Sequence, residues 1–277
     1  MKTLLSCIVI CLSALTLKAQ IPNFSSTQHI DQEFGLGTIS ITYGRPDVKG
    51  RKIFNGTEPY GVVWRTGANA ATIIKFTDEV SIEGHKLRPG EYSLFTIPGA
   101  TEWTVIINKV AKQWGAYSYD QKQDVLRFKV KPYRLPITIE TLTIQFTDVH
   151  IDEGILQILW ERTGIALHLK ADVNDRVIAN IDRMMKGKDK PYYLAAVWYY
   201  NHNLDMTKAL SWMMQQEKAQ PDAYNVKYWK ARIQLKMGNK KGAIMSAKEG
   251  LFIAEKDGNA EYIRMNKEVL RDAGYIK

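Results

Sequence analysis

Hydrophobic and polar residues alternate along most of the chain between Gly37 and Ala171. In residues 38–43 every second side chain is apolar and the others are threonine or serine, which is typical of a strand buried on one face. The same pattern predicts further strands at 71–76, 80–82, 92–97, 103–108, 125–130, 137–146, 155–161 and 165–169. Turn residues separate them, as at Glu83-Gly84-His85, Arg88-Pro89-Gly90, Ile97-Pro98-Gly99 and Thr163-Gly164. About nine short strands with frequent turns indicate an antiparallel β-sandwich or β-barrel.

The hydrophobic period changes at Asp172. Apolar residues then recur at steps of three and four, as they do on one face of a helix. Asp172 can cap the first of these helices, Gly187 can end it, and Pro191 can open the next. No alternating segment follows. We therefore predict a mainly β domain over residues 20–171 and an all-α domain over residues 172–277.

The helical part contains an internal offset. Ala209 and Ala243 lie 34 residues apart, which is the length of a tetratricopeptide repeat. In that frame each alanine is the small residue of a second helix, and Gly238 falls at a turn between helices. We predict two degenerate tetratricopeptide-like (TPR-like) repeats with flanking helices. The aromatic residues of 192–200 are then mostly core, with a peptide-binding groove as the alternative.

The first 19 residues have the plan of a signal peptide. Lys2 is followed by an apolar stretch too short to span a membrane, and Ala19 offers a small residue before a cleavage site. Cys7 and Cys11 lie in the segment that would be removed, so the mature chain is expected to contain no disulfide and no cysteine nucleophile. We expect a periplasmic or secreted protein with no membrane span once residues 1–19 are gone.

The chain carries a net positive charge. Removal of Lys2 and Lys18 lowers the number of basic residues from 38 to 36 against 29 acidic ones, so the formal charge falls from +9 to +7. The basic residues are scattered and form no single block, so we expect no nucleic-acid partner. The charge instead favours anionic surfaces or ligands, or aids solubility.

The densest group of chemically active residues lies in two segments, 43–54 and 59–69. Its candidate ligand-binding residues are Arg45, Lys49, Arg51, Arg65, Thr66 and Asn69. The cations can bind a carboxylate or phosphate, with the hydroxyl and amide as neutral partners. The alternative is a structural loop whose arginines bond carbonyl groups and cover a sheet edge.

A set of aromatic residues is a second candidate. Trp103, Trp114, Tyr117 and Tyr119 can form a floor for sugar rings, with Asn108 and Asp120 as polar partners. Trp114 and Tyr117 are included among the candidate ligand-binding residues. The alternative is that the large residues of 114–119 face the other sheet as core.

Metal and cofactor sites find little support in the sequence. Asp148, His150 and Asp152 would share one face if a strand extended that far, but a solvated strand end needs no ion, and we predict neither a metal nor a cofactor. No nucleophile elbow, phosphate-binding loop, zinc-protease motif or dinucleotide fingerprint occurs in the chain.

Several separated motifs carry a family resemblance. Trp64-Arg65-Thr66-Gly67-Ala68-Asn69 is the most distinctive, and the others lie at 43–54, 87–94, 97–98, 102–105, 108–109, 114–115 and 124–127. In this order they resemble the bacterial family called domain of unknown function 2911 (DUF2911), over residues 34–171. The resemblance implies export in Bacteroidetes-like bacteria and a frequent helical partner region, but no catalytic residues. Ala70 departs from the acidic residue expected at that position.

Three functions remain open from the sequence. The first is a non-catalytic binding or scaffold protein of the envelope, for a glycan, peptide or anionic ligand. The second is a hydrolase of an envelope or dietary polymer, with Asp47, Asp120 or Asp124 as acid or base. The third is a protein–protein interaction module that acts through the helical tail.

Overall fold

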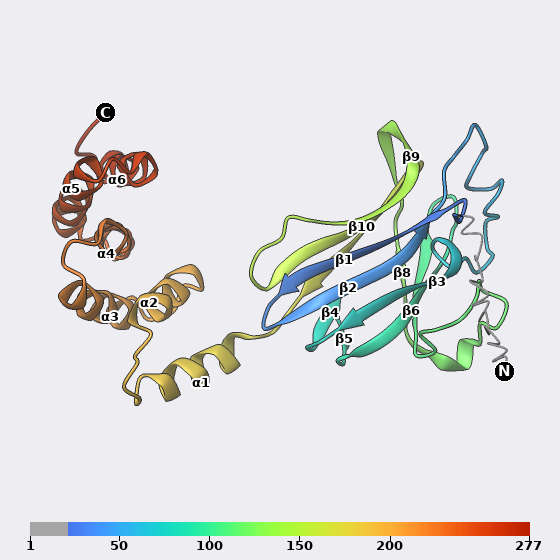
Figure 1. Ribbon diagram of the computed structural model, residues 1–277, viewed down its shortest axis with the longest axis horizontal. Helices are drawn as coiled ribbons and strands as arrows, with labels where there is room; N and C mark the ends of the chain where they lie inside the picture. Colours follow the sequence, from blue (N-terminus) through green and yellow to red (C-terminus); the bar gives the residue numbers. More distant parts are fainter. Residues whose placement is uncertain (1–21) are drawn as a thin grey trace, which may run out of the picture. The chain divides into compact units, whose positions relative to one another are not determined.

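The computed structural model describes residues 22–277 and divides the chain into two compact units (Figure 1). The first ends at Val173 and is built of antiparallel strands, and the second, Asn174–Lys277, is entirely helical. The predicted fold class, a mainly β domain followed by an all-α domain, is therefore confirmed. The predicted signal segment, residues 1–19, lies outside the described residues.

The larger sheet of the β unit has six strands in the order β1-β2-β3-β6-β7-β8, all neighbours antiparallel. Its buried face is supplied by the alternating apolar residues, among them Ile39, Ile41 and Tyr43 of β2. The bounds are β1 Ser26–Phe34, β2 Gly37–Arg45, β3 Ala68–Phe76, β6 Gly90–Ile97, β7 Trp103–Asn108 and β8 Asp124–Val130.

The smaller sheet has four strands in the order β5-β4-β10-β9. They are β4 Val80–Ile82, β5 His85–Leu87, β9 Tyr133–Thr147 and β10 Glu153–Lys170. The expected turn at Thr163-Gly164 is wrong, because β10 runs through it as one long strand that stays paired with β9. The irregularity there is instead two shifts of register, one on either side of Glu161, whose φ is +54°.

An aromatic cluster joins the two sheets. Trp103 comes from the six-stranded sheet and Trp160 from the four-stranded one, and both make edge contacts with Phe54, with ring centroids 4.7 and 6.2 Å apart. Trp64 stacks on Trp160 at 5.7 Å. All four rings are buried. Because large aromatic side chains dominate the energetics of a core, this cluster firmly anchors the loops that enter it.

The helical unit is a row of sequentially packed helices. Ala209 and Ala243 are fully buried in α3 and α5, and Gly238 adopts a φ of +79° at the turn between α4 and α5. The TPR-like identity of these helix pairs stays a prediction. No helix within residues 22–277 is long and apolar enough to cross a membrane. The bounds are α1 Asn174–Met184, α2 Tyr192–Asn201, α3 Met206–Ala219, α4 Tyr224–Lys236, α5 Lys240–Lys256 and α6 Ala260–Asp272.

Candidate functional site

A cavity of about 470 Å³ opens beside the loops that connect β2 to β3. Its walls come from the loop after β2, from the segment just before β3, from Trp160 of β10 and from the N-terminal end of the described chain. We call it the anion pocket. Its lining residues are Phe24, Ser25, Pro46, Asp47, Lys49, Arg51, Thr57, Glu58, Arg65, Gly67, Ala68 and Trp160.

The anion pocket brings together three of the predicted cations, Lys49, Arg51 and Arg65. Lys49 Nζ lies 3.4 Å from Asp47 Oδ2, and Arg51 donates to the carbonyl oxygens of Val48, at 3.0 Å, and Asp47. These two cations therefore already have partners within their own loop, as the structural alternative expects.

Arg65 is held more loosely than the other two. Its Nε donates to the carbonyl oxygen of Gly67 at 3.3 Å, and its terminal nitrogens have no hydrogen-bond partner among residues 22–277. A half-buried guanidinium with free donors is well suited to binding a carboxylate or phosphate. Arg65 is thus the strongest candidate for ligand binding in the anion pocket.

The other predicted polar residues do not line this cavity. Arg45 clamps the sheets together, because its Nε donates to the Leu142 carbonyl at 3.0 Å and its Nη2 to Thr143 at 3.1 Å. Thr66 is fully buried, with its hydroxyl 3.0 Å from that of Thr96. The Asn69 amide donates to the carbonyl oxygen of Ser25 at 3.2 Å. Arg45, Thr66 and Asn69 therefore shape the walls instead of facing the cavity.

Backbone strain gathers around the anion pocket. Lys49, Thr66 and Asn69 have φ values of +46°, +54° and +64°. For the β-branched Thr66 this conformation is a genuine outlier, kept because its carbonyl accepts a hydrogen bond from Thr72 at 2.8 Å. Strained residues that the surroundings hold in place occur preferentially at functional sites.

Two exposed aromatic residues lie in the loop whose Gly115 packs against Arg65. The side chains of Trp114 and Tyr117 are 66% and 83% exposed, so the expectation that they face the other sheet does not describe them. Their loop is fixed by Gly115, whose amide donates to the Asn69 carbonyl at 3.0 Å and whose φ is +65°. A Cβ at position 115 would lie 2.7 Å from the Tyr117 ring and 2.9 Å from Arg65 Nη1. The glycine therefore lets the guanidinium and the phenol ring lie side by side.

The remaining members of the predicted aromatic floor are structural. Trp103 belongs to the buried cluster, and Asn108 is fully buried with its amide bonded to Asp124 and to the Asp120 carbonyl. Tyr119 donates its hydroxyl to Asp124 at 2.7 Å. A floor of four aromatic rings is therefore not assembled.

Glu58 is the residue of the anion pocket that the sequence did not suggest. Burial raises the pKa of its carboxyl to about 7, and the nearby Arg65 and Arg51 only partly oppose this effect. The loop that carries it is tightly folded, since the Glu58 amide donates to the Ile53 carbonyl at 2.9 Å. Nothing in the local pattern marks Glu58, because its burial arises from the tertiary packing of this loop.

Each of the three carboxylates that the sequence suggested as an acid or base accepts hydrogen bonds from other residues. Asp47 lines the anion pocket and accepts from Thr141 at 2.9 Å, a hydrogen bond that lowers the pKa of its carboxyl together with the neighbouring Lys49. Asp124 accepts bonds from Asn108, Tyr119 and Arg127. Asp120 caps the short helix η1, Gln121–Gln123.

The possible metal ligands do not share a strand face. β9 ends at Thr147, and Asp148 turns the chain with a φ of +48°, so Asp148, His150 and Asp152 lie in the loop before β10. Within residues 22–277 there is no group of three or more histidine, cysteine or acidic side chains that could hold a metal ion.

The β unit also carries the family relationship. A family model described as "Protein of unknown function (DUF2911)" matches residues 25–169, more than half of the chain. The chain belongs to the DUF2911 family. The match runs from β1 into the end of β10 and includes every lining residue of the anion pocket except Phe24. No curated protein and no solved structure matched the chain.

Proposed function

We propose that this DUF2911 protein is an exported, envelope-associated binding protein whose β domain holds a carboxylate- or phosphate-bearing ligand in the anion pocket. The observation that carries the proposal is Arg65, which has free guanidinium donors in a cavity and lies beside the exposed ring of Tyr117. Loops on a rigid β scaffold are the usual place for such sites. Export rests on the signal-like residues 1–19.

The electrostatics of the pocket agree with an anionic ligand. Three cations face two carboxyl groups, and one of these, Glu58, is half protonated near neutral pH because burial raises its pKa to about 7. The neutral form of Glu58 can donate a hydrogen bond to an anion, whereas the ionised form would repel it. The exposed ring of Tyr117 offers flat apolar surface beside the charge, which suits a sugar acid.

Arg65→Ala tests this function. Calorimetric titration of the full protein with inorganic phosphate and with glucuronate should show binding that the variant weakens by roughly 1.5–3 kcal/mol, because one charge-assisted contact is lost. The two probes distinguish a phosphate from a carboxylate ligand. Arg88→Ala, which removes another exposed arginine, is the matched control.

The same variants address the structural alternative. If Arg65 only clamps its loop, Arg65→Ala will lower the melting temperature while the wild type binds neither anion. Equal weakening by Arg88→Ala would also contradict the proposal, since it would point to a general effect of net charge.

Acid–base catalysis is the second candidate, and one observation favours it. Asp47 and Glu58 line the same pocket, and their surroundings move the two pKa values in opposite directions, as in enzymes that use one carboxyl as acid and another as base. A hydrolase of this kind should release reducing sugar from a polysaccharide panel and should lose that activity in both Glu58→Gln and Asp47→Asn. Asp31→Asn, at an exposed edge-strand carboxylate, is the control and should keep it.

A further inference from the structure

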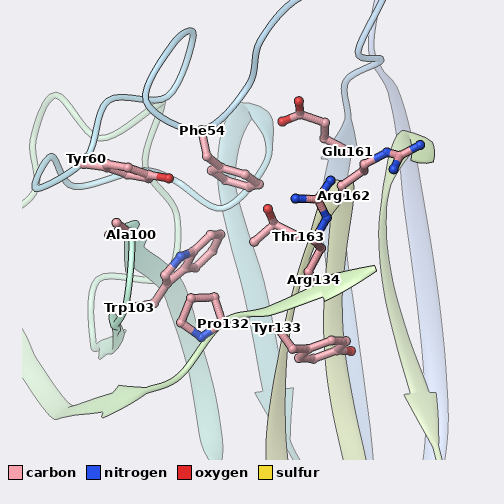
Figure 2. A pocket seen from close by; sticks show the side chains of 11 residues that line it. Phe54, Tyr60, Ala100, Trp103, Pro132, Tyr133, Arg134, Glu161, Arg162 and Thr163 are labelled. Carbon is pink, nitrogen blue, oxygen red and sulfur yellow. The ribbon is translucent and has the colours of Figure 1, made fainter. Parts of the chain in front are cut away.

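A second cavity of about 430 Å³ lies in the β unit and shares no lining residue with the anion pocket. The two are nevertheless built from neighbouring residues, since Phe54 and Glu161 line the second cavity while Glu58 and Trp160 line the first. Figure 2 shows the side chains around it. They come from the loop after β2, the turn after β6, the start of β7, the start of β9 and the middle of β10.

One side of this cavity is aromatic. In Figure 2 the rings of Phe54, Tyr60 and Trp103 lie together on one side, with Tyr133 below them. Phe54 and Trp103 belong to the buried cluster, whereas Tyr60 and Tyr133 are 39% and 37% exposed and present ring surface at the opening. Gly164 fixes the Tyr133 ring, because a Cβ there would lie 2.7 Å from the ring.

The facing side is polar. Figure 2 shows Glu161, Arg134 and Thr163 across from the aromatic rings, while the guanidinium of Arg162 points away. Arg162 is held by a hydrogen bond from its Nε to Thr138 at 3.2 Å. In the part of the chain that the structure describes, neither the Arg134 guanidinium nor the Thr163 hydroxyl has a hydrogen-bond partner. Both are therefore free to bind a ligand.

The backbone of β10 is irregular where it carries Glu161 and Thr163 into the cavity. The two register shifts around Glu161 and its φ of +54° interrupt the alternation of the strand. As a result Trp160 remains in the core, while the Glu161 and Thr163 side chains line the cavity. Bulged strands often redirect side chains next to binding sites.

We propose that this second cavity is a carbohydrate subsite that binds a neutral pyranose ring. The faces of such a ring are apolar and can stack on Tyr60 and Tyr133, and its hydroxyl groups both donate and accept hydrogen bonds. The polar side supplies a donor in Arg134, an acceptor in Glu161 and a group of either kind in Thr163. A purely apolar ligand would leave these groups unpaired.

The experiment titrates the full protein with neutral trisaccharides, namely cellotriose, maltotriose and xylotriose, in a calorimeter. At least one should bind, and Tyr60→Ala and Arg134→Ala should each weaken it about tenfold, which corresponds to about 1.4 kcal/mol. Tyr60→Phe keeps the ring and should retain binding. Tyr275→Ala, at a half-exposed tyrosine of the helical unit, is the matched control and should change nothing.

The outcome is independent of the anion pocket. Arg65→Ala should leave trisaccharide binding intact, so loss of anion binding and loss of neutral sugar binding are separate results. Failure of all three trisaccharides to bind overturns the proposal. So does binding that Tyr60→Ala and Arg134→Ala leave unchanged while both variants keep the wild-type melting temperature.

Discussion

At the scale of single residues, the hydrogen bonds and pKa values of the side chains around the anion pocket depend on residues that are distant in the sequence. Arg45 and Arg65 look equivalent in the sequence, yet one is tied to β9 and the other keeps free donors. Glu58 carries no local signal at all, and burial alone raises its pKa to about 7. The sequence predicted the pocket's cations, because arginine and lysine are conspicuous in a loop. It did not predict which of these cations would form hydrogen bonds or ion pairs with other residues of the chain.

Glu58 gives the pH dependence of stability a definite sign. Its folded-state pKa of about 7 exceeds the ordinary value of 4.5, so the folded protein keeps a proton that the unfolded chain releases between these two pH values. Stability therefore falls as pH rises through this window, by roughly 3 kcal/mol at most. Glu58→Gln removes the effect and should be more stable than the wild type above pH 7.

Urea unfolding of both proteins at about pH 4 and about pH 8 measures this difference, which should be close to zero at the lower value. Glu79→Gln removes an exposed carboxylate beside Lys86 and serves as the control. A stability gain of the same size in that variant would contradict the prediction, since it would reflect net surface charge and not the burial of Glu58.

At the scale of elements, alternation predicted the strands that have one apolar face. β2, β4 and β7 are found close to where the pattern placed them. β1 was not predicted because its sequence, STQHIDQEF, is polar at nearly every position. An exposed edge strand can be this polar because it buries little of its surface. Only pairing with β2 along its whole length makes it a strand.

For β10 the sequence pattern erred in the opposite way, because it predicted two strands where the structure has one. Thr163-Gly164 looks like a turn, but the glycine is there because the Tyr133 ring packs where a Cβ would be. Such a reason is tertiary and is invisible in a local pattern. The irregular segment around Glu161 could not be predicted either, because register depends on the partner strand β9.

At the scale of the whole molecule, the chain consists of two units with separate cores. The β unit buries the aromatic cluster and the apolar faces of two sheets, whereas the cores of the helical unit are smaller. A fragment that ends at Val173 should therefore unfold cooperatively by itself. Residues 174–277 alone should be marginally stable, because short helical arrays bury little surface.

Circular dichroism of the two fragments during heating checks this expectation. A β-type spectrum with a sharp transition is expected for the first fragment, and a broad transition for the second. A sharp, high-temperature transition of the helical fragment would show that its cores around Met213 and Val269 are sufficient for independent folding.

The aromatic cluster has an optical consequence. Trp160 lines the anion pocket and Trp103 lines the second cavity, while Trp64 stacks on Trp160 and meets Trp103 at 6.3 Å. Indoles this close exchange excitation energy, so they emit as one group. A ligand in either cavity will therefore alter the same emission band. Intrinsic fluorescence can detect filling without any label, but only variants specific to one cavity can tell which of the two has been filled.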